Sequence, residues 1–292
     1  MLYVFQNILK RTINLNILVI IMKIGFYNIQ GGTGKTTIAA NFAYILSHSV
    51  KTILIDCDIY GGTTALLFDL EDKEHNLNTY LSGDSAIEDI IYQYDDLAVI
   101  HTDVSSKVFG YKVDLYRFES LIKTLEEEYD VIVYDFPPNI TEDNLLIGYV
   151  GEFELINKVV IVGEDSIPSI VNSLKSMELI RDLGIGLTGI IINKYRGLTD
   201  ISEIIDDVIG ILPYDQNVER QWVESTPIVK IKTKFTKEMT KLTNELASVY
   251  LEKDLASLRA LKLAKSISEL TEEEKLEKEL KELEEFKDLE LK

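Results

Sequence analysis

A glycine-rich segment between an apolar run and an amphipathic run carries the clearest chemistry in this sequence. It reads Gln30-Gly31-Gly32-Thr33-Gly34-Lys35-Thr36-Thr37. Glycines let successive backbone N–H groups converge on one anion, and a helix that follows adds the positive end of its dipole. Lys35 supplies a cation for the β- and γ-phosphates, and Thr36 supplies the hydroxyl expected on Mg²⁺. The segment therefore predicts binding of a nucleoside triphosphate with Mg²⁺.

Aspartates follow two other apolar runs. Asp56 and Asp58 close one of them, and Asp135 closes the other. Alternate residues of an extended chain point to the same side, so Asp56 and Asp58 are expected to face the phosphates together. Carboxylate oxygens suit Mg²⁺, and Asp135 is predicted to reach the metal directly or through water. Gly61 and Gly62 come next and predict a mobile loop. Capping of the following turns is the alternative role for all three aspartates.

An asparagine ends a later apolar run. The side chain of Asn193 can both donate and accept hydrogen bonds, as recognition of the Watson–Crick edge of adenine requires. An ordinary turn residue is the alternative interpretation of Asn193.

Apolar spacing predicts the elements that must position these groups. Predicted strands cover residues 24–28, 52–56, 97–100, 129–135, 158–162 and 187–193, and predicted helices cover 36–47, 113–127, 166–183 and 201–208. Strands that alternate with helices are typical of an α/β fold with a doubly wound, mostly parallel sheet. Ligands of such sheets bind at the carboxyl ends of the strands, where all the groups described above lie.

The glycine-rich segment also indicates a family. Ile29 stands six residues before Lys35, where the general P-loop pattern has glycine. The segment resembles instead the deviant Walker A motif of the ParA/MinD family of P-loop ATPases. The resemblance extends from Met22 to about Tyr250, with the motifs in the family's order. It implies binding of ATP and Mg²⁺, a sandwich homodimer with the nucleotides between the subunits, and slow hydrolysis stimulated by a partner.

The resemblance implies a role for each matching residue. The implied catalytic residues are Lys35 and Asp58, of which Asp58 orients the attacking water. The implied metal-site residues are Thr36, Asp56 and Asp135. The implied nucleotide-binding residues are Gln30, Gly31, Gly32, Thr33, Gly34, Lys35, Thr36 and Thr37, together with Asn193 at the adenine and Pro213 and Asp215 in the loop that closes over it.

Gln30 departs from the family pattern, which usually has lysine at this position. In the family that lysine crosses the dimer interface and contacts the partner's phosphates. Glutamine keeps a hydrogen-bond donor but loses the charge, so less negative charge is stabilised in the transition state. Another cation could replace it, but the sequence does not identify one.

Charge distinguishes the branches of the family. The formal net charge of −19 opposes nucleic acid and anionic lipid, yet residues 228–241 carry five lysines against one glutamate. These lysines could bind DNA without sequence preference, as the ParA partition branch does in its ATP-bound dimer. They are Lys230, Lys232, Lys234, Lys237 and Lys241. The C-terminal segment is acidic, which disfavours the basic membrane-binding helix of the MinD branch.

The predicted function is therefore an ATP-dependent dimerisation switch in plasmid or chromosome partition, acting with a DNA-binding adaptor protein. The alternatives are a MinD-like positioning ATPase that acts on a membrane or a protein partner, and a weakly hydrolysing ATP-dependent scaffold. A single cysteine, Cys57, excludes a disulfide framework and a paired-cysteine metal site. It favours a cytoplasmic protein, which would associate with the nucleoid if it binds DNA.

The 292 residues predict three parts. Residues 1–21 are an N-terminal extension or a misassigned start, because Met22 opens a natural first strand. Residues 22–250 form the ATPase domain. Residues 251–292 form a charged helical tail that is acidic toward its end, either solvent-exposed or available to dock a partner.

Overall fold

The computed structural model describes residues 21–138, 147, 151, 155–198, 201 and 204–248. Residues 21–248 form one compact unit. The predicted N-terminal extension, apart from Ile21, and the predicted tail 251–292 lie outside the described residues.

The described residues form a sheet in the order β3-β4-β2-β5-β1-β6-β7-β8. Its strands are β1 Met22–Tyr27, β2 Thr52–Asp56, β3 Tyr92–Tyr94, β4 Leu97–Ile100, β5 Val131–Asp135, β6 Lys158–Glu164, β7 Gly186–Tyr195 and β8 Val208–Pro213. Neighbouring strands are parallel except β3 and β4, which pair antiparallel. The predicted doubly wound, mostly parallel sheet is confirmed.

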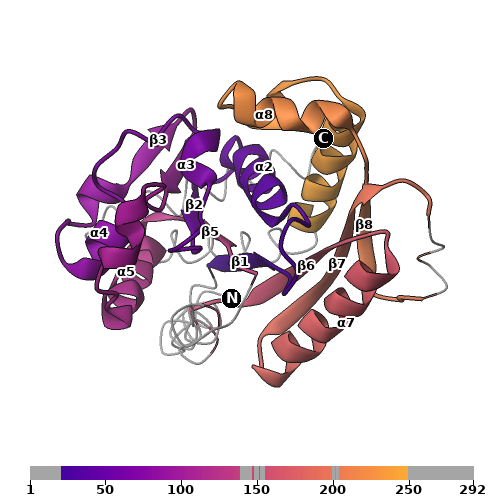
Figure 1. The fold of residues 1–292 in the computed structure, drawn as a ribbon, viewed down its shortest axis with the longest axis horizontal. Coiled ribbons are helices and arrows are strands. Elements are labelled where there is room, and N and C mark those ends of the chain that lie inside the picture. The colour runs from indigo at the N-terminus through magenta and orange to yellow at the C-terminus, as the bar shows by residue number, and fades with distance from the viewer. Residues whose placement is uncertain are drawn as a thin grey trace, which may run out of the picture. The chain divides into compact units, whose positions relative to one another are not determined.

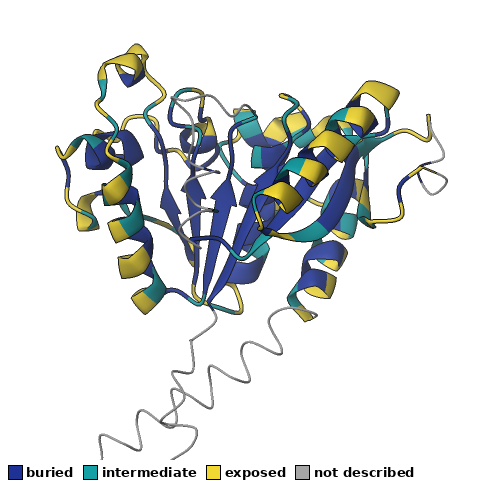
Figure 2. Cartoon of the chain, turned by 90° about the horizontal axis from the view of Figure 1, so that it is seen from below, coloured by how far each residue is buried: buried dark blue, intermediate teal, exposed yellow. Residues whose placement is uncertain are grey.

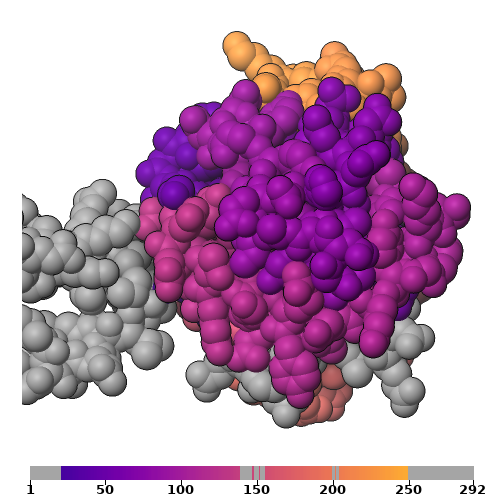
Figure 3. Space-filling view, turned by 90° about the vertical axis from the view of Figure 1, so that its left-hand side faces the viewer, coloured from indigo at the N-terminus to yellow at the C-terminus, as the bar shows by residue number. Residues whose placement is uncertain are grey.

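Helices cover both faces of this sheet. They are α2 Lys35–Ser47, α3 Thr64–Leu67, α4 Leu77–Ser82, α5 Leu115–Glu128, α7 Ile167–Asp182 and α8 Arg220–Val223, with short 3₁₀ turns at Glu88–Ile90, Ser106–Gly110, Gln216–Glu219 and Ile228–Lys230. A further helix occupies residues 234–248. Since crossovers between parallel strands are right-handed, α2 lies on one face, and α5 and α7 lie on the other (Figure 1). Figure 3 shows the end of the molecule that residues of the N-terminal half cover.

The core explains why the strands read as continuous apolar runs. Strands β1, β2, β4 and β5 are buried along their whole length. Both faces of these central strands are covered, so no solvent-facing alternation is expected. Figure 2 shows the buried strands at the centre and the exposed residues on the outer sides of the helices.

Register brings the predicted site residues to one edge of the sheet. Asp56 at the end of β2 is the register partner of Asp135 at the end of β5. Asn193 at the end of β7 is the register partner of Glu164 at the end of β6. Strand β1 lies between β5 and β6. From β1 the chain crosses toward β2 on one side, and from β6 it crosses toward β7 on the other side, so the loop after β1 opens at the point where the direction of the connections reverses. Ligands bind at this point in open α/β sheets.

The predicted helix over 201–208 is wrong. The backbone N–H groups of Ile204 and Ile205 both donate to the carbonyl of Ile201, which gives a single turn. The chain then enters β8 at Val208, and the carbonyl of Asp207 already accepts from Ile190 of the neighbouring strand. Pairing with β7 therefore prevails over the helical spacing of the isoleucines.

We expect substitution of Gly25 by alanine to destabilise the fold. A Cβ at this position in β1 would overlap the Phe136 ring and lie 2.7 Å from Ile156 Cδ1. Overpacking of this kind lowers the free energy of unfolding by about 1–3 kcal/mol. Urea unfolding of Gly25→Ala measures the loss. Gly110→Ala is the matched control because a Cβ there meets nothing within 4 Å. Equal unfolding free energies for the two variants would contradict the packing argument.

Candidate functional site

The loop between β1 and α2 has the backbone geometry of an anion cradle. Gly32 and Gly34 have φ angles of 79° and 95°, in the left-handed region that favours glycine. A Cβ on Gly34 would also overlap the side-chain amide of Asn193. That amide donates from Nδ2 to the carbonyl of Thr33 at 2.8 Å. Asn193 thus holds the loop closed from a strand that lies on the other side of β6.

The buried amine of Lys35 lies against this loop. Its Nζ donates to the carbonyl of Gln30 at 3.1 Å. Burial lowers the pKa of Lys35, while the nearby carboxylates of Asp135 and Asp58 raise it. The three side chains predicted to act together are therefore close enough to interact electrostatically.

Asp135 is buried and only partly satisfied. The Thr36 side chain hydrogen-bonds its carboxylate, and burial followed by the charge of Asp56 holds the pKa of Asp135 well above its usual range. Its Oδ1 atom has no hydrogen-bond partner within the described residues. A buried carboxylate oxygen with an open lone pair next to a threonine hydroxyl fits Mg²⁺, which binds proteins through few ligands and completes its shell with water and phosphate. Consistently, the described residues contain no cluster of three His, Cys, Asp or Glu residues that could hold a metal alone.

Asp56 is fully buried and organises the neighbouring loop. Its carboxylate accepts hydrogen bonds from the backbone N–H groups of Asp58 at 3.0 Å and Thr64 at 3.1 Å, and from Thr102 Oγ1 at 3.2 Å. Burial and the charge of Asp58 raise the pKa of Asp56 to about 6. These bonds fix the backbone of Asp58, whose own side chain is half-buried.

The glycine pair after Asp58 has a packing role in the structure. The carbonyl of Asp58 accepts from Gly62 N at 2.8 Å, and its Oδ1 accepts from Gly61 N at 2.9 Å. A Cβ on Gly62 would overlap Thr102 Oγ1 and Asp56 Oδ2. Close approach to the buried carboxylate therefore requires glycine at position 62, which is a different reason from the mobility predicted from the sequence.

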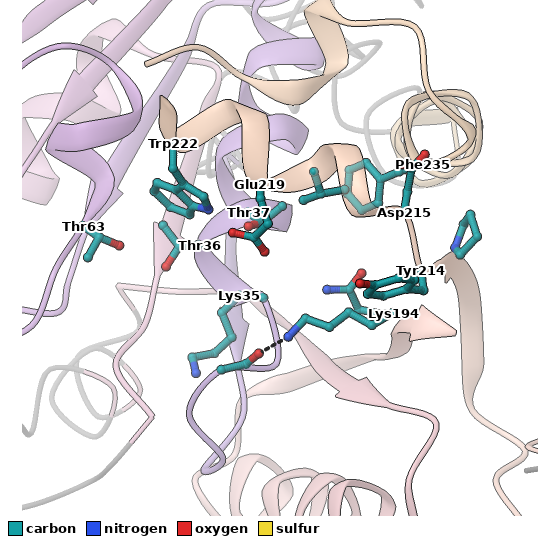
Figure 4. A pocket seen from close by; sticks show the side chains of 15 residues that line it. Lys35, Thr36, Thr37, Thr63, Lys194, Tyr214, Asp215, Glu219, Trp222 and Phe235 are labelled. Atoms are coloured by element: carbon teal, nitrogen blue, oxygen red, sulfur yellow. Dashed lines mark hydrogen bonds between the residues drawn. The ribbon is translucent and has the colours of Figure 1, made fainter. Parts of the chain in front are cut away.

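A cavity of about 260 Å³ opens above the loop (Figure 4). Its lining residues are Gly32, Gly34, Lys35, Thr36, Thr37, Thr63, Asn193, Lys194, Pro213, Tyr214, Asp215, Val218, Glu219, Trp222 and Phe235. The structure thus brings the loop, the predicted adenine asparagine and the predicted closing loop around one space. The remaining predicted site residues lie outside this lining; they are Gln30, Gly31, Thr33, Asp56, Asp58 and Asp135.

The carboxylate of Asp215 is engaged in hydrogen bonds within the protein. Its Oδ1 accepts from Asn217 N at 2.9 Å and its Oδ2 accepts from Lys234 N at 3.1 Å. Hydrogen bonds from Asn217 are the main cause that lowers the pKa of Asp215. The carboxylate therefore ties the closing loop to the helix over 234–248.

Several residues at the site were not predicted from the sequence. Lys194, Trp222 and Phe235 line the cavity, and Gln221, next to Trp222 in the chain, is fully buried. Gln221 donates from Nε2 to Thr37 Oγ1 at 2.9 Å and accepts from Asn41 Nδ2 at 3.2 Å. None of these positions belongs to a short motif. The only local signal is that Trp222 is the single tryptophan of the chain.

Gln221 links the glycine loop to the segment that covers the cavity. Asn41, its partner on α2, also accepts from the backbone N–H of Val229 at 3.0 Å. The first two turns of α2 are thereby joined to both α8 and the segment after it. Any ligand that moves Thr37 also acts on these hydrogen bonds.

We expect Gln221→Leu to destabilise the protein. The substitution removes the amide that pairs with both Thr37 and Asn41 in a fully buried place, which costs about 1–3 kcal/mol. Thermal unfolding should show a clear fall in the midpoint temperature. Gln216→Leu makes the same chemical change at an exposed position and should leave the midpoint nearly unchanged. If the two variants have the same midpoint temperature, the hydrogen bonds of Gln221 to Thr37 and Asn41 contribute nothing to stability.

Comparison with known sequences agrees with this site. A protein-family model described as an AAA domain matches residues 21–149. An uncharacterized ATP-binding protein of Methanocaldococcus jannaschii is 89% identical over 251 residues, which cover 86% of this chain and 95% of that protein.

Solved structures share the fold. The septum site-determining protein MinD from Pyrococcus horikoshii, complexed with Mg-ADP, has a TM-score of 0.69 at 23% identity, covering 78% of this chain and 96% of that one. A ParA family ATPase from Chlorobium tepidum has a TM-score of 0.63 at 18% identity, covering 76% of this chain and 98% of that one.

Proposed function

Because the chain belongs to the ParA/MinD family of ATPases, we propose that it is a switch that binds ATP with Mg²⁺, dimerises in the ATP-bound form and hydrolyses ATP slowly. The observation that carries this proposal is the glycine loop itself, with Gly32 and Gly34 in the left-handed region and the Lys35 amine held against the carbonyl of Gln30, within electrostatic reach of Asp58 and Asp135. Charge neutralisation and positioning are what phosphoryl transfer requires of a protein.

Each predicted residue has a proposed role consistent with its contacts. Lys35 would neutralise the terminal phosphates, and Thr36 and Asp135 would hold Mg²⁺, which would supply further positive charge to the phosphates. Asp56 positions Asp58 through the backbone N–H of that residue. The half-buried carboxylate of Asp58 orients the attacking water. Asn193 donates from Nδ2 to Thr33 in the loop and uses its remaining hydrogen-bonding capacity to read the adenine, within a cavity wall that includes Pro213 and Tyr214.

We expect Asp58→Ala to retain nucleotide binding and lose turnover. The substitution removes the group that orients water but leaves the glycine loop intact. Calorimetry with ATP and Mg²⁺ measures affinity, and phosphate release measures turnover. Lys35→Ala is the companion variant, and it should lose binding itself because its buried amine faces the loop. Full turnover in Asp58→Ala would contradict the assignment of the water-orienting role.

The ATP-bound form is further proposed to bind DNA in plasmid or chromosome partition, with a DNA-binding adaptor as its partner. Lys230 contributes less to this than the sequence suggests. Its amine pairs with Asp95 at 2.9 Å and lies over the rings of Tyr44 and Tyr94. The hydrogen bond that Lys230 donates to Asp95 is the main cause that raises the pKa of Lys230. The amine of Lys230 therefore anchors its own segment to the fold.

The other lysines of the segment are better placed for a phosphate backbone. Lys232, Lys234 and Lys237 are exposed, and the last two lie in the first turn of the helix over 234–248. Thr233 caps this helix by accepting from Thr236 N at 3.0 Å. Lysines at a helix N-terminus are unfavourable for the helix dipole, so their presence favours a role in binding anions over a role in helix stability. Lys241 is also exposed and approaches Glu245 at 3.7 Å.

We expect the triple substitution of Lys232, Lys234 and Lys237 by glutamine to weaken DNA binding in the presence of ATP and to reduce its salt dependence. If each lysine contacts a phosphate, the log–log slope of affinity against salt should fall by roughly one unit per lysine. Filter binding at two salt concentrations measures this. A matched triple substitution of the exposed lysines Lys107, Lys112 and Lys123 should bind as the wild-type protein does. If wild-type protein with ATP fails to bind DNA at low salt, the partition role is wrong.

Action on a protein partner is the second candidate function, as in MinD-like positioning. Ile167, Val171 and Leu174 are exposed along one stripe of α7, a helix whose Asn172 contacts Gln30 of the glycine loop. An apolar stripe beside the nucleotide site could bind a partner protein in one nucleotide state only. Action on a membrane and service as a weakly hydrolysing scaffold have no comparable feature among the described residues to favour them. No helix in the described part of the chain is long and apolar enough to cross a membrane.

A further inference from the structure

We propose that Lys194 is the second cation for the phosphates of the bound nucleotide, and that it supplies within the same subunit the charge that Gln30 lacks. The inference rests on the proposed function, because it assigns a further residue to the same nucleotide site. Lys194 lines the cavity together with Lys35 and directly follows Asn193 in β7.

The backbone of Lys194 is held in an unusual conformation. Its φ angle of 52° lies in the left-handed region, which residues other than glycine adopt rarely. Strain of this kind persists where surrounding structure imposes it and is found preferentially at ligand sites. The result is that the long side chain lies back across the glycine loop. Its Nζ donates a hydrogen bond to the carbonyl of Gly32 (Figure 4).

Glu164 is the second contact of the Lys194 amine. Its Oε1 lies 2.8 Å from Nζ, and the two side chains are 25% and 42% exposed. Glu164 ends β6 beside β7, so the pair is built by adjacent strand ends. The amine is thus placed at the loop with one neutral partner and one charged partner, neither of which is a phosphate.

A nucleoside triphosphate in the cavity would need a cation in addition to Lys35 and Mg²⁺. Of the described residues that line the cavity, Lys35 and Lys194 are the two with cationic side chains. Other nearby cations are engaged: the Arg196 guanidinium lies 3.9 Å over the Tyr214 ring, and Arg220 pairs with Glu224 at 2.6 Å. A triphosphate carries more negative charge than one Mg²⁺ and one lysine neutralise. Among the described residues that line the cavity, Lys194 is the cation beside Lys35, and its own charged partner is Glu164.

Gln30 does not take this role from Lys194. Its side-chain Oε1 accepts from Asn172 Nδ2 at 3.4 Å, which directs it toward α7. Its carbonyl is the group that receives the Lys35 amine. The side chain at position 30 therefore serves the contact between the loop and α7 and adds no charge.

The proposal makes Lys194 and Glu164 act in opposite directions. A phosphate oxygen is a stronger partner for the ammonium than the carbonyl of Gly32, because both groups are charged. Glu164 competes with the phosphate for the same ammonium. Removing the charge of Lys194 should therefore weaken nucleotide binding, whereas removing the charge of Glu164 should strengthen it.

The test is calorimetry of the full chain with Mg²⁺ and a non-hydrolysable ATP analogue. Lys194→Gln should weaken binding about ten- to a hundredfold, the size of one charged hydrogen bond. Glu164→Gln should tighten binding, and it should have no effect in the presence of Lys194→Gln. Lys123→Gln on α5 is the matched control, since it also removes a lysine paired with a glutamate and should leave affinity unchanged.

The outcomes separate this inference from the proposed function. If Lys194→Gln binds like Lys123→Gln, or if Glu164→Gln weakens binding or leaves it unchanged, Lys194 only supports the loop and the inference is wrong. A tightening by Glu164→Gln cannot arise from misfolding. If the wild-type protein itself does not bind the analogue, the proposed function falls together with the inference. If Lys35→Ala loses binding and Lys194→Gln does not, the proposed function stands and only the role of Lys194 is wrong.

Discussion

The pairing of two buried carboxylates at the edge of a parallel sheet is the constraint on which the site depends. Asp56 and Asp135 are register partners at the ends of adjacent strands, and both are removed from solvent. Buried charge of one sign is unfavourable unless hydrogen bonds or cations offset it. Backbone N–H groups, threonine hydroxyls and the Lys35 amine supply part of this compensation. The open oxygen of Asp135 leaves a place for a cation.

The second half of the chain makes that edge into a binding site. Asn193 holds the glycine loop from β7, and Gln221 holds the first turn of α2 from the segment that follows β8. Both side chains are buried amides, and each hydrogen bond joins residues that are more than 150 positions apart in the sequence. Such bonds respond to small displacements of the loop because a buried amide left without a partner is costly. They are a physical route by which a bound phosphate could influence α8 and the lysines beyond it.

Much of this arrangement could be predicted from the sequence, for identifiable reasons. Continuous apolar runs gave the central strands, and the glycine loop with its lysine needs only local geometry. The contacts that later parts of the chain make with the glycine loop and α2 could not be predicted. Gln221 and Lys194 belong to no motif, and their partners lie far away in the sequence. The isoleucines of 201–208 suit a helix and a turn before a strand equally well, and strand pairing decided between them. Gly62 was predicted to make its loop mobile, whereas in the structure glycine is required there because a side chain would overlap Asp56.

The proposed function requires that the nucleotide control the assembly of this protein. Dimerisation driven by ATP requires that the dimer bind the triphosphate more tightly than the monomer does. Sedimentation velocity of the full chain with Mg²⁺, in a non-hydrolysable ATP analogue and separately in ADP, tests this directly. We expect a dimer in the analogue and a monomer in ADP. The same sedimentation coefficient in both nucleotides, with binding of each verified, would contradict it.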